Sequence, residues 1–379
     1  MPTGARPADA LIVGGGVIGL ATAWRAARAG LAVTVVDRSP GHGSTWAAAG
    51  MLAPVAEAHF GEEALVALNL EAAASWPAFA RSLEAESGLR VDYVRSGSLI
   101  VAVDPSDRAA VNDLLAFQRG LGLRVEQLGA RACRQAEPLL APGIAGGVDV
   151  VDDHQVDNRL LVAALLAACR DLGVELVADE VAEVRPGSGV VLAGQGPRSA
   201  GTVVLAAGWQ TGAIAGLSDA DAVPVRPVKG MTLRLARRPG EAALTRTVRG
   251  LVHGVPCYLV PRPDGSLVVG ATSEERGDDA GVRAGAVHDL LRDGRALVPS
   301  LDEYDLVETS VGFRPASPDN GPIIGPVADG LIVATGHTRN GILQAPLTAE
   351  AVLAHLEGRP PPASVAPFGP GRFDRRADR

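Results

Sequence analysis

The feature that most constrains this fold is a glycine-rich turn close to the start of the chain. An apolar run over residues 10–13 leads into Gly14, Gly16 and Gly19, and a second apolar run over residues 31–36 follows. In such a pattern the first glycine permits a tight turn, the second lets the backbone approach a pyrophosphate, and the third lets a helix pack close to the sheet. The spacing therefore predicts a strand–helix–strand unit that binds a dinucleotide at the N-terminus of its helix.

An acidic residue ends the second apolar run, where such a unit holds a ribose. Asp37 lies 23 residues after Gly14, close to the spacing of about 20 that this motif uses. Its carboxylate can accept hydrogen bonds from ribose hydroxyls and would repel a 2′-phosphate, so NADP is disfavoured. These residues alone leave NAD and FAD equally open. They could also form a glycine turn that binds nothing, or part of a signal peptide, although Arg25 and Arg28 suit a signal peptide poorly.

Composition and charge exclude several classes of protein. The 379 residues suffice for two domains, and 47% hydrophobic with 21% charged residues are typical of a soluble globular chain. A net charge of −8 argues against nucleic-acid binding, and the longest apolar run, residues 160–169, is too short to cross a membrane. Three widely separated cysteines, Cys133, Cys169 and Cys257, indicate a reducing cytoplasm and no zinc or other metal site.

Helical and strand patterns alternate along most of the chain, which predicts an α/β protein. Helices are expected over residues 17–29, 62–87 with a kink at Pro77, 106–120 capped by Ser106, 158–172 capped by Asp157, 284–298 and 346–357. Buried strands are expected over residues 99–103, 174–177, 203–206, 306–313 and 331–334. Between residues 225 and 269 short apolar segments alternate with Pro and Gly, which is typical of an antiparallel sheet.

This order of elements predicts a discontinuous architecture: a Rossmann-like cofactor domain with an inserted α+β substrate domain built on an antiparallel sheet. The cofactor domain is expected to comprise residues 1–90, 145–220 and 311–360. The substrate domain is expected to comprise residues 91–144 and 221–310. The prolines and charges of residues 361–379 predict a disordered tail.

Further motifs carry chemical meaning. Residues 44–52 are small and hydroxyl-bearing, and residues 203–209 form an apolar strand that runs into an Ala-Gly turn. Arg314 ends an apolar strand just before a proline, which fixes its backbone, and a guanidinium matches a planar carboxylate with two parallel hydrogen bonds. Residues 336–346 follow an apolar strand and open a helix, whose N-terminus can stabilise developing negative charge.

Each motif could also play a purely structural role when it is taken singly. Residues 44–52 could simply start a helix, and Arg314 could form a surface salt bridge. Tyr258, within the strand-like segment 257–262, could be a core tyrosine. His253 alone fits a surface or pocket-rim position, and His337 fits an ordinary loop histidine and a ligand-facing one equally well.

Taken together and in order, these motifs resemble the glycine oxidase and D-amino-acid oxidase family of FAD-dependent amine oxidoreductases, over about residues 5–355. Within that family the chain is most similar to the glycine oxidases of thiamine biosynthesis. Sarcosine-oxidase relatives attach flavin through a cysteine in the C-terminal half or a histidine near the start. Here no cysteine follows Cys257 and residues 44–46 hold no histidine, so the resemblance implies noncovalent FAD.

The resemblance implies a set of FAD contacts spread over six segments. They are Gly14, Gly16, Val17, Ile18, Gly19, Asp37, Arg38, Ser44, Thr45, Ala49, Gly50, Met51, Val181, Ala207, Gly208, His337, Thr338, Arg339, Asn340, Gly341, Ile342 and Leu343. For the substrate it implies that Arg314 anchors the carboxylate and that the Tyr258 hydroxyl bonds the same group. It also implies that Arg339 lies near flavin and substrate, and we expect His253 to line that pocket.

The activity implied by the resemblance is oxidation of glycine, sarcosine or small D-amino acids by hydride transfer from Cα to flavin N5. The imino acid would hydrolyse to glyoxylate and ammonia or enter thiazole synthesis for thiamine, and oxygen would reoxidise the flavin, giving hydrogen peroxide. We expect no nucleic-acid or membrane partner, and a cytoplasmic homo-oligomer such as a homotetramer. Two alternatives stay open: a dehydrogenase or oxidase with another acceptor or substrate (a D-amino-acid dehydrogenase, or a sarcosine or D-amino-acid oxidase), and a flavin-binding sensor that is not an enzyme.

Overall fold

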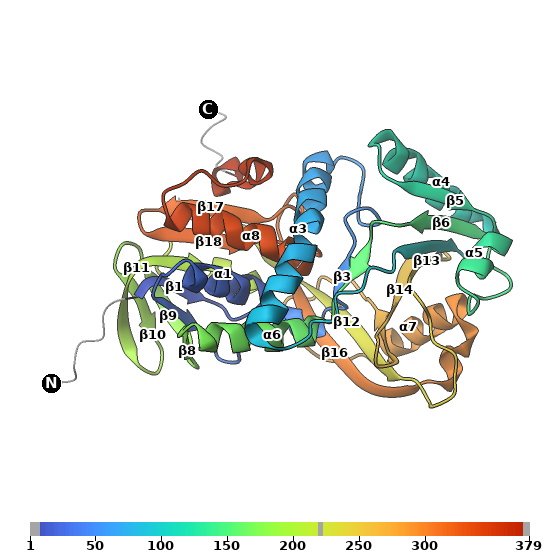
Figure 1. Ribbon diagram of the computed structural model, residues 1–379, viewed down its shortest axis with the longest axis horizontal. Coiled ribbons are helices and arrows are strands. Elements are labelled where there is room, and N and C mark those ends of the chain that lie inside the picture. Colours follow the sequence, from blue (N-terminus) through green and yellow to red (C-terminus); the bar gives the residue numbers. More distant parts are fainter. Residues whose placement is uncertain (1–7, 219–222, 374–379) are drawn as a thin grey trace.

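The computed structural model describes residues 8–218 and 223–373 and contains two large β-sheets side by side (Figure 1). The centre of the first sheet is parallel, in the order β8–β2–β1–β11–β18, and β17 closes one edge antiparallel. A hairpin of β9 and β10 extends β11. The strands are β1 (Ala8–Val13), β2 (Val33–Val36), β8 (Glu175–Val177), β9 (Val181–Arg185), β10 (Gly189–Leu192), β11 (Gly196–Leu205), β17 (Ile323–Ala328) and β18 (Leu331–Thr335). The expected Rossmann-like arrangement is confirmed.

Four helices pack against one another over this sheet and form a continuous hydrophobic core with it. They are α1 (Val17–Arg28), α3 (Glu63–Ser87), α6 (Asn158–Asp171) and α8 (Gly341–Leu356). Trp24 of α1 and Trp76 of α3 are fully buried, and both pack edge-on against Phe79. As expected, the Asp157 side chain caps α6, because its Oδ1 accepts hydrogen bonds from the first amides of the helix.

The second sheet has the order β16–β12–β15–β14–β13–β4–β6–β5 and is antiparallel except for the β13–β4 pair. Its strands are β4 (Ser98–Ala102), β5 (Val125–Leu128), β6 (Gly146–Val150), β12 (Arg226–Ala236), β13 (Thr247–Val252), β14 (Val255–Pro261), β15 (Ser266–Gly270) and β16 (Asp305–Ala316). Helix α7 (Ala284–Leu297) packs on one face through Leu290 and Leu297. Helices α4 (Pro105–Gly120) and α5 (Ala130–Ala136) contact the β4–β6–β5 end.

The segment from Ser44 to Leu52 lies against the other face of the second sheet. It comprises α2 (Ser44–Ala47) and β3 (Met51–Leu52), which pairs with β7 (His154–Gln155). The Thr232 hydroxyl of β12 donates to the Ala47 carbonyl at 2.8 Å. Because α1, β1 and β2 hold the glycine turn on the first sheet, this segment connects the two units at the place where a cofactor and a substrate would meet.

Several expected boundaries differ from the structure. Strands β6 and β16 pair within the second sheet, so residues 145–150 and 311–316 belong to the inserted unit rather than to the cofactor domain. Helix α4 begins at Pro105 with Asp104 as its cap, and the expected cap Ser106 lies inside its first turn. Helix α8 begins at Gly341, although it contains Pro346.

The segment after residue 360 is folded where the structure describes it, so the expected disordered tail is wrong for residues 361–373. Two short 3₁₀ turns, η4 (Ala363–Phe368) and η5 (Pro370–Phe373), pack on β17. Val365 and Phe368 are buried, and Arg372 forms an ion pair with Asp319 at 2.8 Å. The prolines favour these turns and do not disorder the segment, while residues 374–379 lie outside the described ranges.

Two further 3₁₀ turns are η1 (Gly208–Ala213) and η3 (Pro299–Glu303).

None of the helices in residues 8–218 and 223–373 is both long enough and apolar enough to span a bilayer.

Candidate active site

The glycine turn is closed by contacts that only glycine permits. Gly14 has φ +108°, and a β-carbon there would lie 2.4 Å from the Ala206 carbonyl oxygen. A β-carbon on Gly19 would lie 1.9 Å from the Gly14 oxygen. These contacts press the start of α1 against the end of β11, so the turn at Ala207 and Gly208 lies beside the first motif. The structure thus brings two motifs that are separated by about 190 residues to one place.

The first turn of α1 has no side-chain cap. Its cap residue, Gly16, offers no side chain, and Val17 and Ile18 are buried. The Val17 amide donates to the Thr45 hydroxyl at 3.1 Å, and the Ser44 hydroxyl donates to the Phe313 carbonyl at 2.5 Å. These bonds hold the segment from Ser44 onward next to the glycine turn.

Asp37 lies at the end of β2, beside the same turn. Its Oδ2 accepts the Gly15 amide at 2.7 Å and its Oδ1 accepts the Ser39 amide at 2.7 Å. Farther out, Arg38 is exposed and pairs with Glu180 at 3.4 Å, next to Val181 at the start of β9. These residues mark the side of the sheet where the adenosine half of a dinucleotide would lie.

The N-terminus of α8 is a second helix end without a protein cap. Its cap residue, Asn340, makes no side-chain hydrogen bond to the helix. Within the described residues the buried Asn340 Nδ2 has no hydrogen-bond partner, and the neighbouring Ile342 and Leu343 are buried. Buried helix ends need partners for their free amides. Gly341 at the first position leaves these amides accessible, so both helix ends fit the anionic and polar parts of a flavin dinucleotide.

His337 lies buried in this loop, at the start of the turn that leads into α8. It is 2% exposed, and its Nε2 lies 3.0 Å from the Thr348 hydroxyl of α8. Burial lowers the pKa of His337 to about 3, so the ring is neutral at pH 7. Thr338 follows with φ +47° and donates its amide to the Pro315 carbonyl at 3.0 Å, which fixes the loop against the end of β16.

One face of the second sheet carries the polar side chains expected at the substrate. In the sheet register Arg249 lies opposite Tyr258, and Tyr258 lies opposite Gly270. Gly270 lies opposite Thr232, whose hydroxyl contacts the Ala47 carbonyl. Directly opposite residues share a face, so Tyr258 and Arg249 point toward the segment that starts at Ser44.

Three glycines on that face leave room for larger neighbours. A β-carbon on Gly270 would lie 2.5 Å from the Tyr258 hydroxyl, and one on Gly230 would lie 2.4 Å from Arg314 Nη1. A β-carbon on Gly312 would lie 2.8 Å from the Ala47 β-carbon. The close approach of the Ser44 segment and the positions of Tyr258 and Arg314 therefore require glycine at these three positions.

Arg314 is the cation of this face that is free to bind an acid. Its Nη1 donates to the Thr272 carbonyl at 3.1 Å, and no carboxylate of residues 8–218 or 223–373 forms an ion pair with it. Burial raises the pKa of Tyr258 to about 12, although the charges of Arg314 and Arg249 act in the opposite direction. Tyr258 is thus a neutral hydroxyl donor near Arg314, as expected for two groups that bind one carboxylate.

Arg339 is placed near this face but is held by acids. Its Nε lies 2.8 Å from Glu57 and its Nη2 lies 2.5 Å from Glu62. Glu57 also pairs with Arg249 at 2.5 Å, and Arg249 donates to the Met51 sulfur at 3.6 Å. Glu57, Glu62 and Arg249 are not among the residues predicted from the sequence. A single charged residue in the otherwise apolar strand β13 was the one available signal.

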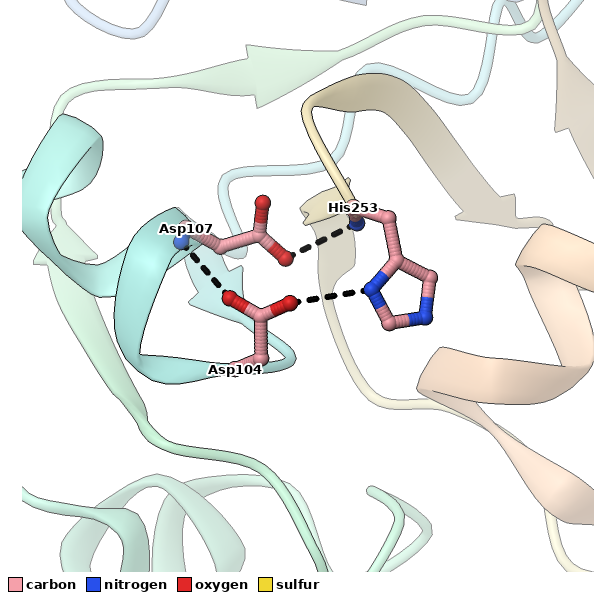
Figure 2. A group of neighbouring side chains, drawn as sticks. All are labelled: Asp104, Asp107 and His253. Atoms are coloured by element: carbon pink, nitrogen blue, oxygen red, sulfur yellow. Dashed lines mark hydrogen bonds and ion pairs between the residues drawn. The ribbon is translucent and has the colours of Figure 1, made fainter.

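His253 lies elsewhere, so its expected place in the substrate pocket is wrong (Figure 2). It occupies the turn between β13 and β14 with φ +50°, and its side chain is 74% exposed. Nδ1 bonds Asp104 at 2.9 Å, while Asp107 accepts the amides of His253 and Gly254 at 2.9 and 2.7 Å. The reason is that the turn docks on the N-terminus of α4 at the far end of the strand, whereas Tyr258 lies in its middle.

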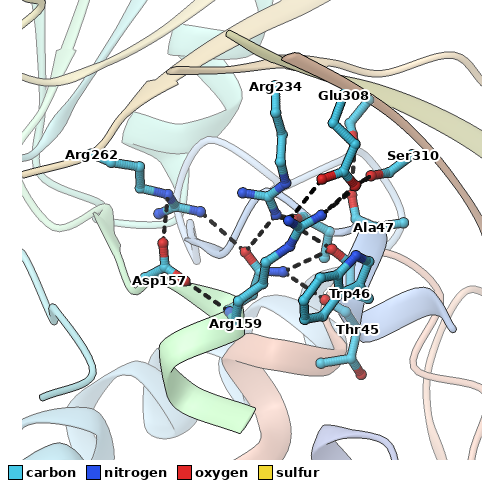
Figure 3. A network of polar contacts seen from close by, with 12 residues as sticks. Thr45, Trp46, Ala47, Asp157, Arg159, Arg234, Arg262, Glu308 and Ser310 are labelled. Carbon is cyan, nitrogen blue, oxygen red and sulfur yellow. Dashed lines mark hydrogen bonds and ion pairs between the residues drawn. The ribbon is translucent and has the colours of Figure 1, made fainter. Parts of the chain in front are cut away.

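Three arginines, Arg159, Arg234 and Arg262, form a network that holds the segment from Thr45 to Ala49 (Figure 3). Arg234 points its Nη2 toward the Trp46 and Ala48 carbonyls at 3.3 and 3.4 Å, and Arg262 donates to the Ala49 carbonyl at 2.6 Å. Arg159 stacks on the Trp46 ring at 3.8 Å and forms a bidentate ion pair with Glu308. Burial and the nearby Arg159 and Arg262 lower the pKa of Arg234 to about 10.

The backbone carbonyls of this segment are thereby bound on the side of the second sheet. Gly50 has φ +72°, and a β-carbon there would lie 2.0 Å from the Val156 carbonyl oxygen. These contacts restrict the conformation of the segment, and Met51 and Tyr258 pack against a small apolar cluster that contains Ala49. Small residues at these positions let a flat ligand lie against the backbone.

Comparison with known proteins shows the family to which the chain belongs. The family model described as FAD dependent oxidoreductase (DAO) matches residues 9–355. The glycine oxidase of Geobacillus kaustophilus is 36% identical over 371 residues, which cover 95% of this chain and 96% of that protein. Its crystal structure superposes with a TM-score of 0.89 at 33% identity, covering 97% of this chain and 100% of that chain.

Two other relatives carry different names. The hydrogen cyanide synthase subunit HcnC of Pseudomonas aeruginosa is 30% identical over 410 residues, which cover 97% of each chain. The bifunctional protein ThiO/ThiG of Trichormus variabilis is 33% identical over 97% of this chain. This chain spans about half of that bifunctional protein, 56% of its length.

Proposed function

The chain belongs to the family of FAD-dependent oxidoreductases and is an FAD-dependent amine oxidoreductase, and from this premise we propose that it oxidises glycine and related small amines. The observation that carries the proposal is the pairing of a free guanidinium, Arg314, with a neutral hydroxyl, Tyr258, on the sheet face beside the Ser44 segment. This pair can bind one carboxylate through charge-assisted hydrogen bonds.

The cofactor lies, in this proposal, between the two sheets. The N-terminus of α1 and the turn at Gly14 receive the diphosphate, and Asp37 receives the ribose of the adenosine half. The N-terminus of α8 at Gly341 and the segment from Thr45 to Met51 would hold the flavin ring. No cysteine follows Cys257, in keeping with noncovalent binding.

When it is bound, FAD supplies the oxidation by accepting a hydride from the substrate. The protein supplies position: Arg314 and Tyr258 hold the carboxylate and thereby fix the direction in which Cα–H points. Glu57 is held by two arginines and His337 is buried against Thr348, so neither side chain is free to act as a base. We infer that the substrate binds as the neutral amine.

The products follow from the substrate. Oxidised glycine leaves as an imino acid, which water converts to glyoxylate and ammonia, while oxygen is reduced to hydrogen peroxide. The likeness to the ThiO/ThiG protein supports a role in which the imine is used for thiazole synthesis in thiamine biosynthesis. The three buried, free cysteines support a reducing cytoplasm, and we propose a homo-oligomeric state there.

The test is to purify the protein, record its flavin spectrum, and measure hydrogen peroxide with glycine, sarcosine, D-alanine and D-proline in parallel. We expect a yellow protein whose FAD is released on denaturation, and peroxide in proportion to the amine consumed. Reduction of the bound flavin by amines without peroxide would indicate a dehydrogenase, and no reduction by any amine would leave a flavin-binding sensor.

The role of Arg314 is tested by replacing it with Ala and with Lys. Loss of a charged partner of the carboxylate is expected to cost roughly 2–5 kcal/mol in substrate binding, and Lys is expected to restore part of it because it keeps the charge without the planar fork. If kcat/KM for glycine falls less than about tenfold in the Ala variant, the carboxylate lies elsewhere.

A further inference from the structure

One carboxylate, that of Glu57, forms ion pairs with two arginines, Arg249 and Arg339. Glu57 uses Oε1 for Arg249, at 2.5 Å, and Oε2 for Arg339, at 2.8 Å. Glu62 gives Arg339 a second acidic partner at 2.5 Å. The side chains of Glu57 and Glu62 are 13% and 14% exposed, so solvent screens these contacts little.

Glu57 stays ionised in this position. Burial opposes its ionisation, but Arg249 and Arg339 outweigh burial and lower the pKa of Glu57 to about 2. The charges of Arg314, Arg249 and Glu57 all act on the pKa of the Tyr258 hydroxyl. Glu57 therefore belongs to the same electrostatic environment as the carboxylate site, although the structure gives it no contact with Arg314.

We propose that Glu57 determines substrate specificity: by occupying Arg249 and Arg339 it leaves Arg314 as the cation for one substrate carboxylate and excludes amines that carry a second one. The proposal deepens the proposed function and rests on it through the role of Arg314. A second carboxylate near the largely buried Glu57 would meet a like charge, with no free guanidinium to receive it. Juxtaposed like charges of this kind are a common means of rejecting a ligand.

The amide variant Glu57→Gln is the direct test, because it keeps the size and hydrogen bonds of the side chain and removes the charge. Two substrates of equal shape separate charge from size: iminodiacetate, and N-isobutylglycine, whose branched end replaces the second carboxylate by methyl groups. In the wild-type enzyme we expect kcat/KM for iminodiacetate to be at least about tenfold lower than for N-isobutylglycine. In Glu57→Gln we expect the ratio of kcat/KM for iminodiacetate to kcat/KM for N-isobutylglycine to rise by roughly tenfold or more.

Two matched variants control for the change itself. Glu62→Gln also removes an acidic partner of Arg339 but leaves Glu57 on both arginines, and we expect the ratio to change less than about threefold. Glu57→Asp keeps the charge and shortens the side chain, and we expect the preference for one carboxylate to remain. A loss of turnover on all substrates alike in Glu57→Gln, with their ratio unchanged, would be a purely structural effect and would overturn the role of Glu57 in specificity.

A binding measurement separates this proposal from the proposed function. Glycolate and oxydiacetate carry one and two carboxylates and have no amine to oxidise, and their binding can be followed by perturbation of the flavin absorbance. We expect glycolate to bind the wild-type protein more tightly than oxydiacetate. In Glu57→Gln we expect the difference in affinity between the two acids to become smaller or to reverse. If no amine is oxidised but this order holds, the proposed function fails and the role of Glu57 stands. Equal binding of both acids by wild type, or an order unchanged in Glu57→Gln, overturns the role of Glu57.

Discussion

The guanidinium of Arg314 lies directly over the bare α-carbon of Gly230. The two residues belong to neighbouring strands, β16 and β12, and a β-carbon on Gly230 would lie 2.4 Å from Arg314 Nη1 and 2.7 Å from its Cζ. The position of the proposed carboxylate anchor is therefore set by the absence of a side chain across the strand pair.

Gly230→Ala is expected to impair substrate binding and leave the fold intact. The new methyl group displaces the flexible end of Arg314, and a misplacement on the order of 1 Å costs up to about 100-fold in kcat/KM. The free energy of unfolding should change by less than about 1 kcal/mol, since Ala suits a strand interior at least as well as Gly. Steady-state kinetics and urea unfolding measure both.

The control is Gly285→Ala in α7, where a β-carbon meets nothing within 4 Å. We expect unchanged kinetics there. A wild-type KM for glycine in Gly230→Ala would mean that the Arg314 guanidinium is not held in this position when substrate binds.

Local sequence patterns carried the prediction of the glycine turn and of Arg314, because each depends on neighbours in the chain. Gly19 requires glycine for its contact with the Gly14 oxygen within one strand–turn–helix, and Arg314 lies in an apolar run directly before Pro315. Both are features that a short stretch of sequence contains. The same is true of Asp157, whose side chain caps the helix that starts one residue later.

The acid–arginine cluster could not be predicted in this way. Glu57 meets Arg249 and Arg339 only because three segments, separated by about 190 and 90 residues, converge on one sheet face. Nothing near Glu57 in the sequence indicates which arginine it meets. His253 shows the reverse error: it is close to Tyr258 in sequence, but an extended strand of about 3.3 Å per residue carries the two apart.

Arg262 is expected to be essential for the segment that faces the flavin. It is 6% exposed and donates to the carbonyls of Ala49 and Val156 at 2.6 and 2.9 Å (Figure 3 shows its place in the network). Arg262→Met keeps most of the volume but leaves buried carbonyls without donors, which should cost roughly 3–5 kcal/mol of stability. Urea unfolding and the FAD dissociation constant should both show the loss.

Arg262→Lys separates charge from geometry in that network. A lysine ammonium lacks the planar fork that reaches two carbonyls at once, so we expect an intermediate loss of FAD affinity. FAD affinity equal to wild type in both variants would contradict a role of Arg262 in holding the segment.

Phe368 is expected to anchor the last described segment of the chain. It is 5% exposed, and its ring lies so close to Gly321 that a β-carbon there would be 2.5 Å from the ring. Phe368→Ala should lower the free energy of unfolding by about 3 kcal/mol or more. Phe60 is 66% exposed and offers a control, because Phe60→Ala should change the free energy of unfolding by less than about 1 kcal/mol. Equal unfolding curves for wild type and Phe368→Ala would mean that this segment does not contribute to the fold in solution.

His337 is expected to make the protein sensitive to acid. Burial lowers its pKa from 6.5 to about 3, so between these values the unfolded chain binds a proton that the folded chain does not. Stability from this group is complete above pH 6.5 and decreases as the pH falls toward 3. The loss between pH 6.5 and 5 is about 2 kcal/mol, at roughly 1.4 kcal/mol per pH unit.

A second buried group acts in the opposite direction and must be separated from His337. Burial raises the pKa of Asp153 from 3.8 to about 6, although Arg249 opposes this. Here the folded chain binds the extra proton, so the stability from Asp153 is present at low pH and is lost as the pH rises from 3.8 through 6. Between these values the two contributions partly cancel in the wild-type protein.

The two variants His337→Gln and Asp153→Asn should therefore change the loss of unfolding free energy on acidification in opposite directions. Urea unfolding at pH 7 and pH 5 should show that His337→Gln loses less stability on acidification than wild type, and that Asp153→Asn loses more. Gln can still bond the Thr348 hydroxyl, and Asn can still accept the Val55 amide, so the charge is the main difference in each case. The same pH dependence in His337→Gln as in wild type would show that the ring takes up its proton in the folded protein without cost.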